Sequence, residues 1–157
     1  MHIDTADVAR VFRFTVRHAH SVLGALGCRP IHRSGKGGVR FVWSGRDVLG
    51  ALTCAALVRR GVSVPEAEAV GRVIVTLPSD EQLEAVLDSG RSWVMCIGDS
   101  PMPELLFIEN VRRVARERAE TLTAHGLSLT ALDVAPLYAA LRDTLTAQKQ
   151  VPDVATE

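Results

Sequence analysis

Two adjacent helical patterns and a glycine-rich turn, all within residues 3–43, constrain this chain more than any other stretch. The side-chain oxygen of Asp4 or Thr5 can cap a first helix. Thr15 can cap a second helix over residues 16–26, and a short turn separates the two. Two short helices joined in this way predict a helix–turn–helix.

The second of these helices has distinct inward and outward faces. Apolar residues recur at helical spacing and are expected to face inward: Val16, Ala19, Leu23 and Leu26. Polar residues fall between them and are expected to point largely outward: Arg17, His18, His20 and Ser21. The helix is expected to end at Gly27, because Pro30 prevents any continuation.

A strand–turn–strand pattern follows the second helix. Residues 31–33 lead into the turn Ser34-Gly35-Lys36-Gly37-Gly38, and residues 39–43 return with alternating character. One face of the returning strand is expected to carry Val39, Phe41 and Trp43. The hairpin is cationic through Arg33, Lys36 and Arg40.

Helical signals dominate the chain from the hairpin to Pro78. Ser44 is expected to cap a helix that stops at Gly61, and residues 63–66 have the composition of another helix start. Residues 73–77 are ambiguous, because their β-branched side chains fit a strand while their apolar period fits a helix. We expect the helix to continue through them until Pro78 ends it.

The C-terminal half mixes helical and strand signals. Helices are expected over residues 79–87, 110–124 and 135–147. Strands are expected over residues 92–98, 104–108 and 127–134, the first two as a hairpin. The predicted fold class is α+β, mainly α: a winged helix–turn–helix domain (residues 1–78) of four helices and a β-hairpin wing, followed by a small α+β domain (residues 79–157).

The net charge of zero conceals a division between the two halves. Residues 1–75 carry 11 Lys and Arg against 5 Asp and Glu, whereas residues 76–157 carry 7 against 13. A basic half joined to an acidic half indicates a polyanion-binding module attached to a second segment. We assign that second segment to dimerisation or effector binding.

The basic half predicts an interface with double-stranded DNA. The second helix of a helix–turn–helix enters the major groove, and basic residues of a wing neutralise neighbouring phosphates. The candidate contacts on the helices and their turn are Arg13, Thr15, Arg17, His18, His20 and Ser21. Those on the hairpin are Arg33, Ser34, Lys36 and Arg40.

Residues 3–71 resemble the N-terminal domain of the MerR family of transcription regulators. The resemblance lies in the phrases TADVAR and FTVR, the strand Arg40-Phe41-Val42-Trp43, the helix entry Ser44-Gly45-Arg46-Asp47-Val48 and the link RGVSVPEA. It implies a four-helix winged fold that binds DNA as a homodimer on an inverted repeat. Two features depart from the family: Ser21 and Val22 replace a pair of tyrosines, and an acidic α+β segment replaces the long dimerising helix.

Three functions remain open from the sequence. The first is a sequence-specific transcriptional regulator that acts as a homodimer on a near-palindromic site, dimerising through the C-terminal strands or residues 135–147. The second is an excisionase-like architectural factor of a mobile element, since such proteins share the winged module. The third is a protein-interaction module whose winged domain does not bind DNA.

Several other kinds of function and site are not expected from this sequence. No nucleophile, base or paired carboxylates assemble into a catalytic pattern, so we predict no enzyme activity and no cofactor. Cys28, Cys54 and Cys96 are far apart and match no metal or disulfide spacing, so we expect reduced, buried thiols and no metal site. The sequence has no signal segment and no membrane-spanning run, which predicts a cytoplasmic protein. An effector ligand is left open.

Overall fold

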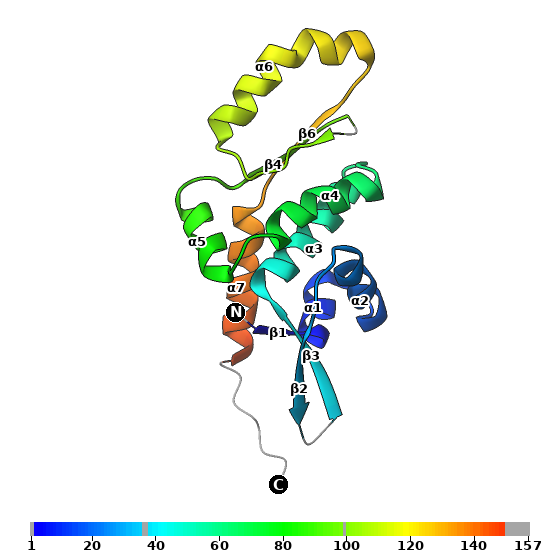
Figure 1. Cartoon of the computed structure of the whole chain (residues 1–157), viewed down its shortest axis with the longest axis vertical. Coiled ribbons are helices and arrows are strands. Elements are labelled where there is room, and N and C mark those ends of the chain that lie inside the picture. Colours follow the sequence, from blue (N-terminus) through cyan, green and yellow to red (C-terminus); the bar gives the residue numbers. More distant parts are fainter. Residues whose placement is uncertain (1, 36–37, 99, 150–157) are drawn as a thin grey trace.

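The computed structural model describes residues 2–35, 38–98 and 100–149, with residues 2, 32–35, 38–40 and 147–149 described by their backbone alone. This part of the chain is α+β and mainly helical, which confirms the predicted class (Figure 1). Its first seven elements are β1 (His2–Asp4), α1 (Thr5–Phe12), α2 (Val16–Ala25), β2 (Ile31–Gly35), β3 (Gly38–Ser44), α3 (Gly45–Val58) and α4 (Val64–Val75). The remaining six are α5 (Asp80–Asp88), β4 (Trp93–Ile97), β5 (Ser100–Pro101), α6 (Ile108–His125), β6 (Leu129–Asp133) and α7 (Ala135–Lys149).

The predicted caps of α1 and α2 are present. The Asp4 carboxylate accepts from the Ala6 backbone N–H at 2.7 Å, and the Thr15 hydroxyl accepts from the His18 N–H at 3.2 Å. Arg13 ends α1 in the left-handed conformation with φ of 56°, which turns the chain sharply toward α2. The two helices and their turn therefore begin and end close to where the sequence predicts.

The prediction that Val16 faces inward on α2 is wrong. This residue is 48% exposed, whereas Ala19 and Leu23 are buried as predicted. Val16 lies in the first turn of α2, where it borders an open groove together with Asp4 and His20. The core reaches α2 only from its second turn onward, so the apolar period alone overestimates the buried stripe.

The β2–β3 hairpin has a third strand that the sequence did not predict. The antiparallel sheet order is β1-β3-β2, with Ile3 opposite Trp43 and Ile31 opposite Val42. Strand β1 has only three residues, which is too short for alternation to register as a strand signal. It covers the otherwise open edge of β3, and Ile3 is buried as a result.

Helices α3 and α4 start at the predicted capping boxes and cross with their backbones in contact. The Ser44 backbone N–H donates to Asp47 at 3.1 Å, and the Ser63 N–H donates to Glu66 at 3.2 Å. A Cβ added to Gly50 would lie 2.9 Å from the Gly71 carbonyl oxygen, so the crossing requires glycine there. Helix α4 runs to Val75, which settles the ambiguous segment as mostly helix.

The second sheet has the order β5-β4-β6, with α6 against one face and α4 against the other (Figure 1). The predicted return strand over residues 104–108 is wrong. Strand β5 pairs with β4 instead, Leu106 adds a single bridge to Trp93, and Ile108 begins α6. The Met102 backbone N–H still donates to the Met95 carbonyl at 2.9 Å, but Pro103 has no N–H to extend the ladder toward Leu106.

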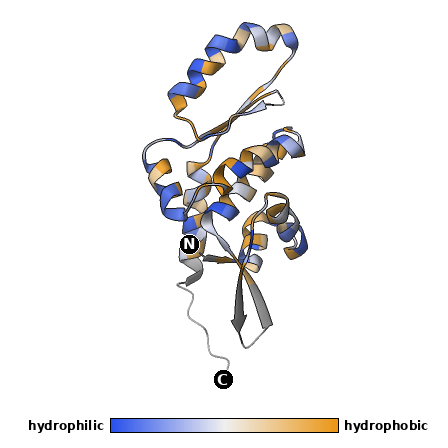
Figure 2. Cartoon of the chain, in the orientation of Figure 1, coloured by the Kyte–Doolittle hydropathy of each residue, from blue (hydrophilic) through white to orange (hydrophobic). Residues whose placement is uncertain are grey.

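One buried apolar cluster extends through both halves of the chain. It contains Trp43 and Leu49 from the N-terminal half together with Leu83, Leu132 and Leu141 from the C-terminal half. Figure 2 shows α3 and α4 as largely hydrophobic ribbons and α6 as largely hydrophilic. Because the core is continuous across Pro78, a division of the chain at that point stays a prediction.

Three hydrogen bonds join α5 to its neighbours. The Asp80 carboxylate accepts from the backbone N–H groups of Gly45 and Arg46, both at 2.9 Å, so it holds the start of α3. The Tyr138 hydroxyl donates to Glu84 at 2.8 Å, which ties α7 to α5. None of the helices in the described residues has the length and hydropathy needed to cross a membrane.

Candidate nucleic-acid interface

A polar face of α2 lies open to solvent beside the β2–β3 hairpin. Arg17 and Ser21 are exposed and stand four positions apart, which places them on one face of the helix. His18 is exposed on the neighbouring face, and its ring meets Phe14 edge-on at 4.4 Å. Arg13, in the turn before α2, is exposed as well. Within the described residues, neither Arg13 nor Arg17 has an ion-pair partner.

Thr15 is exposed and already serves α2 as its cap. Its oxygen accepts the His18 backbone N–H at 3.2 Å, which leaves the hydroxyl proton available for an external acceptor. The first turn of α2 also presents the positive end of the helix dipole. This end of α2 therefore combines a helix N-terminus, a hydroxyl and the Arg17 guanidinium.

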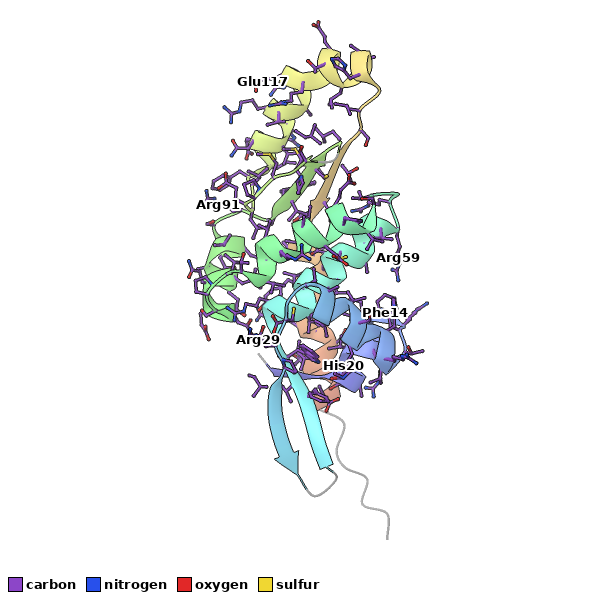
Figure 3. All side chains as sticks on the ribbon, turned by 45° about the vertical axis from the view of Figure 1, so that its right-hand side comes forward. Phe14, His20, Arg29, Arg59, Arg91 and Glu117 are labelled. Atoms are coloured by element: carbon purple, nitrogen blue, oxygen red, sulfur yellow. The ribbon has the colours of Figure 1, made fainter. Side chains whose placement is uncertain are left out.

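His20 lies differently from the other predicted contacts, because it is half-buried between α2 and β3 (Figure 3). Its ring meets Phe41 edge-on at 4.9 Å and Trp43 at 5.5 Å. The outward orientation predicted for His20 is therefore wrong. An imidazole between these two rings fixes the hairpin relative to α2 through packing.

A buried hydroxyl provides a second link between the helices and the hairpin. Trp43 Nε1–H donates to Thr5 Oγ1 at 2.9 Å, and Thr5 Oγ1 donates to the Phe41 carbonyl at 3.1 Å. The Thr5 hydroxyl thus satisfies two polar groups of β3 from the first turn of α1. The sequence singled out Thr5 only as a possible helix cap, because nothing in one chain indicates which distant indole it meets.

The predicted hairpin contacts are only partly within the described residues. Arg33 and Arg40 are direct cross-strand partners, as are Ser34 and Val39. The side chains of Arg33, Ser34 and Arg40 lie outside the described residues, and so does the whole of Lys36.

An open groove of about 500 Å³ separates the start of α1 from the start of α2 and from Phe41. It contains the carboxylates of Asp4 and Asp7, together with Val16 and His20. Asp7 pairs with Arg10 at 3.2 Å. The groove therefore presents the Asp4 carboxylate beside an Asp7–Arg10 ion pair.

The cysteines behave as core residues. Burial, together with the neighbouring Asp47 carboxylate, raises the pKa of Cys28 to about 12. Burial likewise raises the pKa of Cys54 to about 11, with Glu68 adding to the effect. All three thiols are buried and free, as predicted, and these two stay protonated near neutral pH. Among the described residues, no three potential metal ligands converge.

The predicted contacts fall into three groups by position. Arg13, Thr15, Arg17, His18 and Ser21 are exposed at α2 and its turn, and His20 is an internal contact. The side chains of Arg33, Ser34 and Arg40, and the whole of Lys36, are outside the described residues. No protein-family model and no curated protein matches this chain.

Proposed function

We propose that this protein is a sequence-specific DNA-binding transcriptional regulator that acts as a homodimer. Helices α1 and α2 serve as the helix–turn–helix, and the β2–β3 hairpin serves as the wing. One observation carries the proposal: the exposed Arg17 and Ser21 face of α2 lies beside a cationic hairpin that buried contacts hold in place. A helix of this kind can enter the major groove while the hairpin follows the phosphates.

The proposal assigns different tasks to the two sets of residues. Arg17, His18 and Ser21 read base edges, because arginine forms bidentate hydrogen bonds with guanine and short polar side chains adapt to either base type. The hairpin arginines, Lys36 and Arg13 contact phosphates and contribute salt-dependent affinity without sequence preference. His20 is reassigned from base reading to orienting the wing, since its ring is occupied by Phe41 and Trp43.

The homodimer forms through the β5-β4-β6 sheet. Strand β6 stands at an edge of that sheet, and an exposed edge can pair with a second copy. Helix α7, the other candidate, is less suitable because Tyr138 and Leu141 are buried in the core of their own chain. A two-fold dimer places two copies of α2 about one helical turn of DNA apart, which requires a near-palindromic site.

The deciding experiment selects genomic DNA fragments on the purified protein and maps the bound sites by footprinting. One symmetric site per dimer supports the proposed regulator. Phased head-to-tail sites with DNA bending would instead indicate an architectural factor. The absence of any salt-dependent retention would remove DNA binding altogether and leave a protein-interaction module.

A further inference from the structure

A second surface of α2 lines an apolar pocket on the side away from the hairpin. The pocket lies between α2, the end of α3 and the start of α4, and has a volume of about 310 Å³. Its lining is Phe14, His18, Val22, Cys54, Ala55, Val58, Arg59, Val64 and Glu68. Small-molecule sites in proteins begin at about 300 Å³ and share this mostly apolar lining with a few polar groups.

The pocket holds apolar surface that the chain itself leaves uncovered. Val58 and Val64 are 39% and 53% exposed, and both belong to its wall. Removing these apolar side chains from water is favourable. An occupant with an apolar body would therefore be stabilised there.

The polar groups at the pocket define the charge of that occupant. Glu68 is neutralised by Arg72, whose Nη2 lies 3.3 Å from its Oε2. Arg59 is exposed and has no ion-pair partner among the described residues. Figure 3 shows Arg59 at the end of α3 on the same side of the molecule as Phe14. An uncompensated guanidinium beside an apolar wall complements an anion with a hydrophobic body.

We propose that this pocket binds a small hydrophobic organic acid. The hydrocarbon part lies against Phe14, Val22 and Val58, and the carboxylate pairs with Arg59. The volume suits a molecule of modest size, whereas a helix of a partner protein would need a longer groove than these nine residues provide.

Because the pocket adjoins the proposed DNA-reading face of α2, a bound acid should change the affinity for DNA. His18 and Val22 stand four positions apart on one face of α2, Phe14 lies just before the helix, and the Arg17 and Ser21 face adjoins that of His18 and Val22. His18 belongs both to the pocket and to the proposed base-reading set. An acid bound there would restrict His18 and so change DNA affinity. This coupling rests on the proposed DNA-binding function, whereas binding of the acid does not.

The binding experiment compares octanoate with 1-octanol and octylamine, which have the same chain length and differ in charge. Isothermal titration calorimetry is expected to show saturable one-to-one binding of octanoate, with 1-octanol weaker and octylamine weakest. Arg59→Gln should weaken octanoate about tenfold and leave 1-octanol unchanged, which corresponds to about 1.4 kcal/mol. Arg60→Gln is the matched control, because Arg60 is a neighbouring exposed arginine outside the pocket lining.

Several outcomes would overturn the acid site. These are equal octanoate affinities for Arg59→Gln and Arg60→Gln, octylamine binding as tightly as octanoate, and no saturable octanoate binding at millimolar concentration. Ala55→Leu should fill the pocket and abolish binding of both octanoate and 1-octanol, with circular dichroism confirming that the variant folds. Self-association that is lost in Val64→Ser would identify a second copy as the occupant and also overturn the proposal.

The effect of acid binding on DNA affinity is measured separately. Octanoate should shift the affinity of the wild-type protein for its selected DNA and should have no effect on Arg59→Gln. Unchanged DNA affinity at saturating octanoate would overturn the coupling and leave the binding site intact. Failure to bind any DNA would overturn the proposed function, while calorimetry would still decide whether the acid binds.

Discussion

Thr5 Oγ1 accepts a hydrogen bond from Trp43 Nε1–H at 2.9 Å inside the core, and its own hydroxyl donates to the Phe41 carbonyl at 3.1 Å. Trp43 is 2% exposed, so water cannot replace the threonine oxygen. A single hydroxyl at the start of α1 therefore sets where β3 lies against the helices. The hairpin that we propose to contact phosphates therefore depends on Thr5, which is not among the proposed contacts.

Thr5→Val should test this relationship. Valine has nearly the same shape but removes the acceptor of the buried Trp43 indole N–H and the hydrogen bond that Thr5 donates to the Phe41 carbonyl. We expect a loss of about 1–3 kcal/mol in the free energy of unfolding, measured by urea denaturation. Thr5→Ser retains the hydroxyl and should lose less of the unfolding free energy than Thr5→Val. Equal stability of the valine and serine variants would show that the hydrogen bonds contribute nothing.

The contacts assigned to base reading and to phosphate should separate by specificity and salt dependence. Arg17→Ala is expected to relax base preference at one position of the site, at a cost of about 1–3 kcal/mol. Lys36→Ala is expected to weaken binding to all DNA sequences alike and to flatten the dependence of that affinity on salt. Competition binding at several salt concentrations measures both. If neither substitution changes affinity at low salt, the helix–turn–helix does not bind DNA.

Asp80 should make folding sensitive to acid. Burial raises the pKa of its carboxyl, but hydrogen bonds, including those from the Arg46 and Gly45 backbone N–H groups, outweigh burial and hold the pKa below its usual value. A depressed folded-state pKa means that the stabilisation is fully present above the unfolded value of about 3.9 and is lost as the pH falls through the folded value.

Asp80→Ala should consequently cost about 2 kcal/mol of unfolding free energy at neutral pH and progressively less below pH 4. Glu81→Ala is the control, because it removes an acid from the same first turn of α5 without touching the α3 backbone. Thermal melts of the three proteins across this pH range provide the comparison. A loss for Asp80→Ala that does not depend on pH would contradict the charge argument.

Gly50→Ala should weaken the crossing of α3 and α4. The new Cβ would lie 2.6 Å from Val75 Cγ2 and 2.9 Å from the Gly71 carbonyl oxygen, so the helices must separate. Overpacking of this kind costs about 1–3 kcal/mol. Gly24→Ala is the control: its Cβ would meet nothing within 4 Å, and replacing a helical glycine should stabilise by about 0.4–1 kcal/mol. Chemical denaturation should therefore move the two variants in opposite directions.

Local signals in the sequence located most helices of this protein. Ser44 with Asp47, Ser63 with Glu66, and Thr15 act through hydrogen bonds within a few residues, so their consequences can be read from neighbouring positions. An apolar run over residues 104–108 does not by itself specify a strand, which is why the strand predicted there is absent. Short apolar segments fit several structures, and in this case the nearby prolines limited the pairing.

The candidate site likewise has features that the sequence predicts and features that depend on tertiary packing. The sequence alone determined the exposed polar face around Arg17 and Ser21, because helical period and residue type are local properties. Only the tertiary structure decided that His20 packs against β3, that Thr5 meets Trp43, and that β1 completes the sheet. These contacts join residues more than 20 positions apart, and which distant side chains come together depends on how the whole core packs rather than on any pattern along the chain.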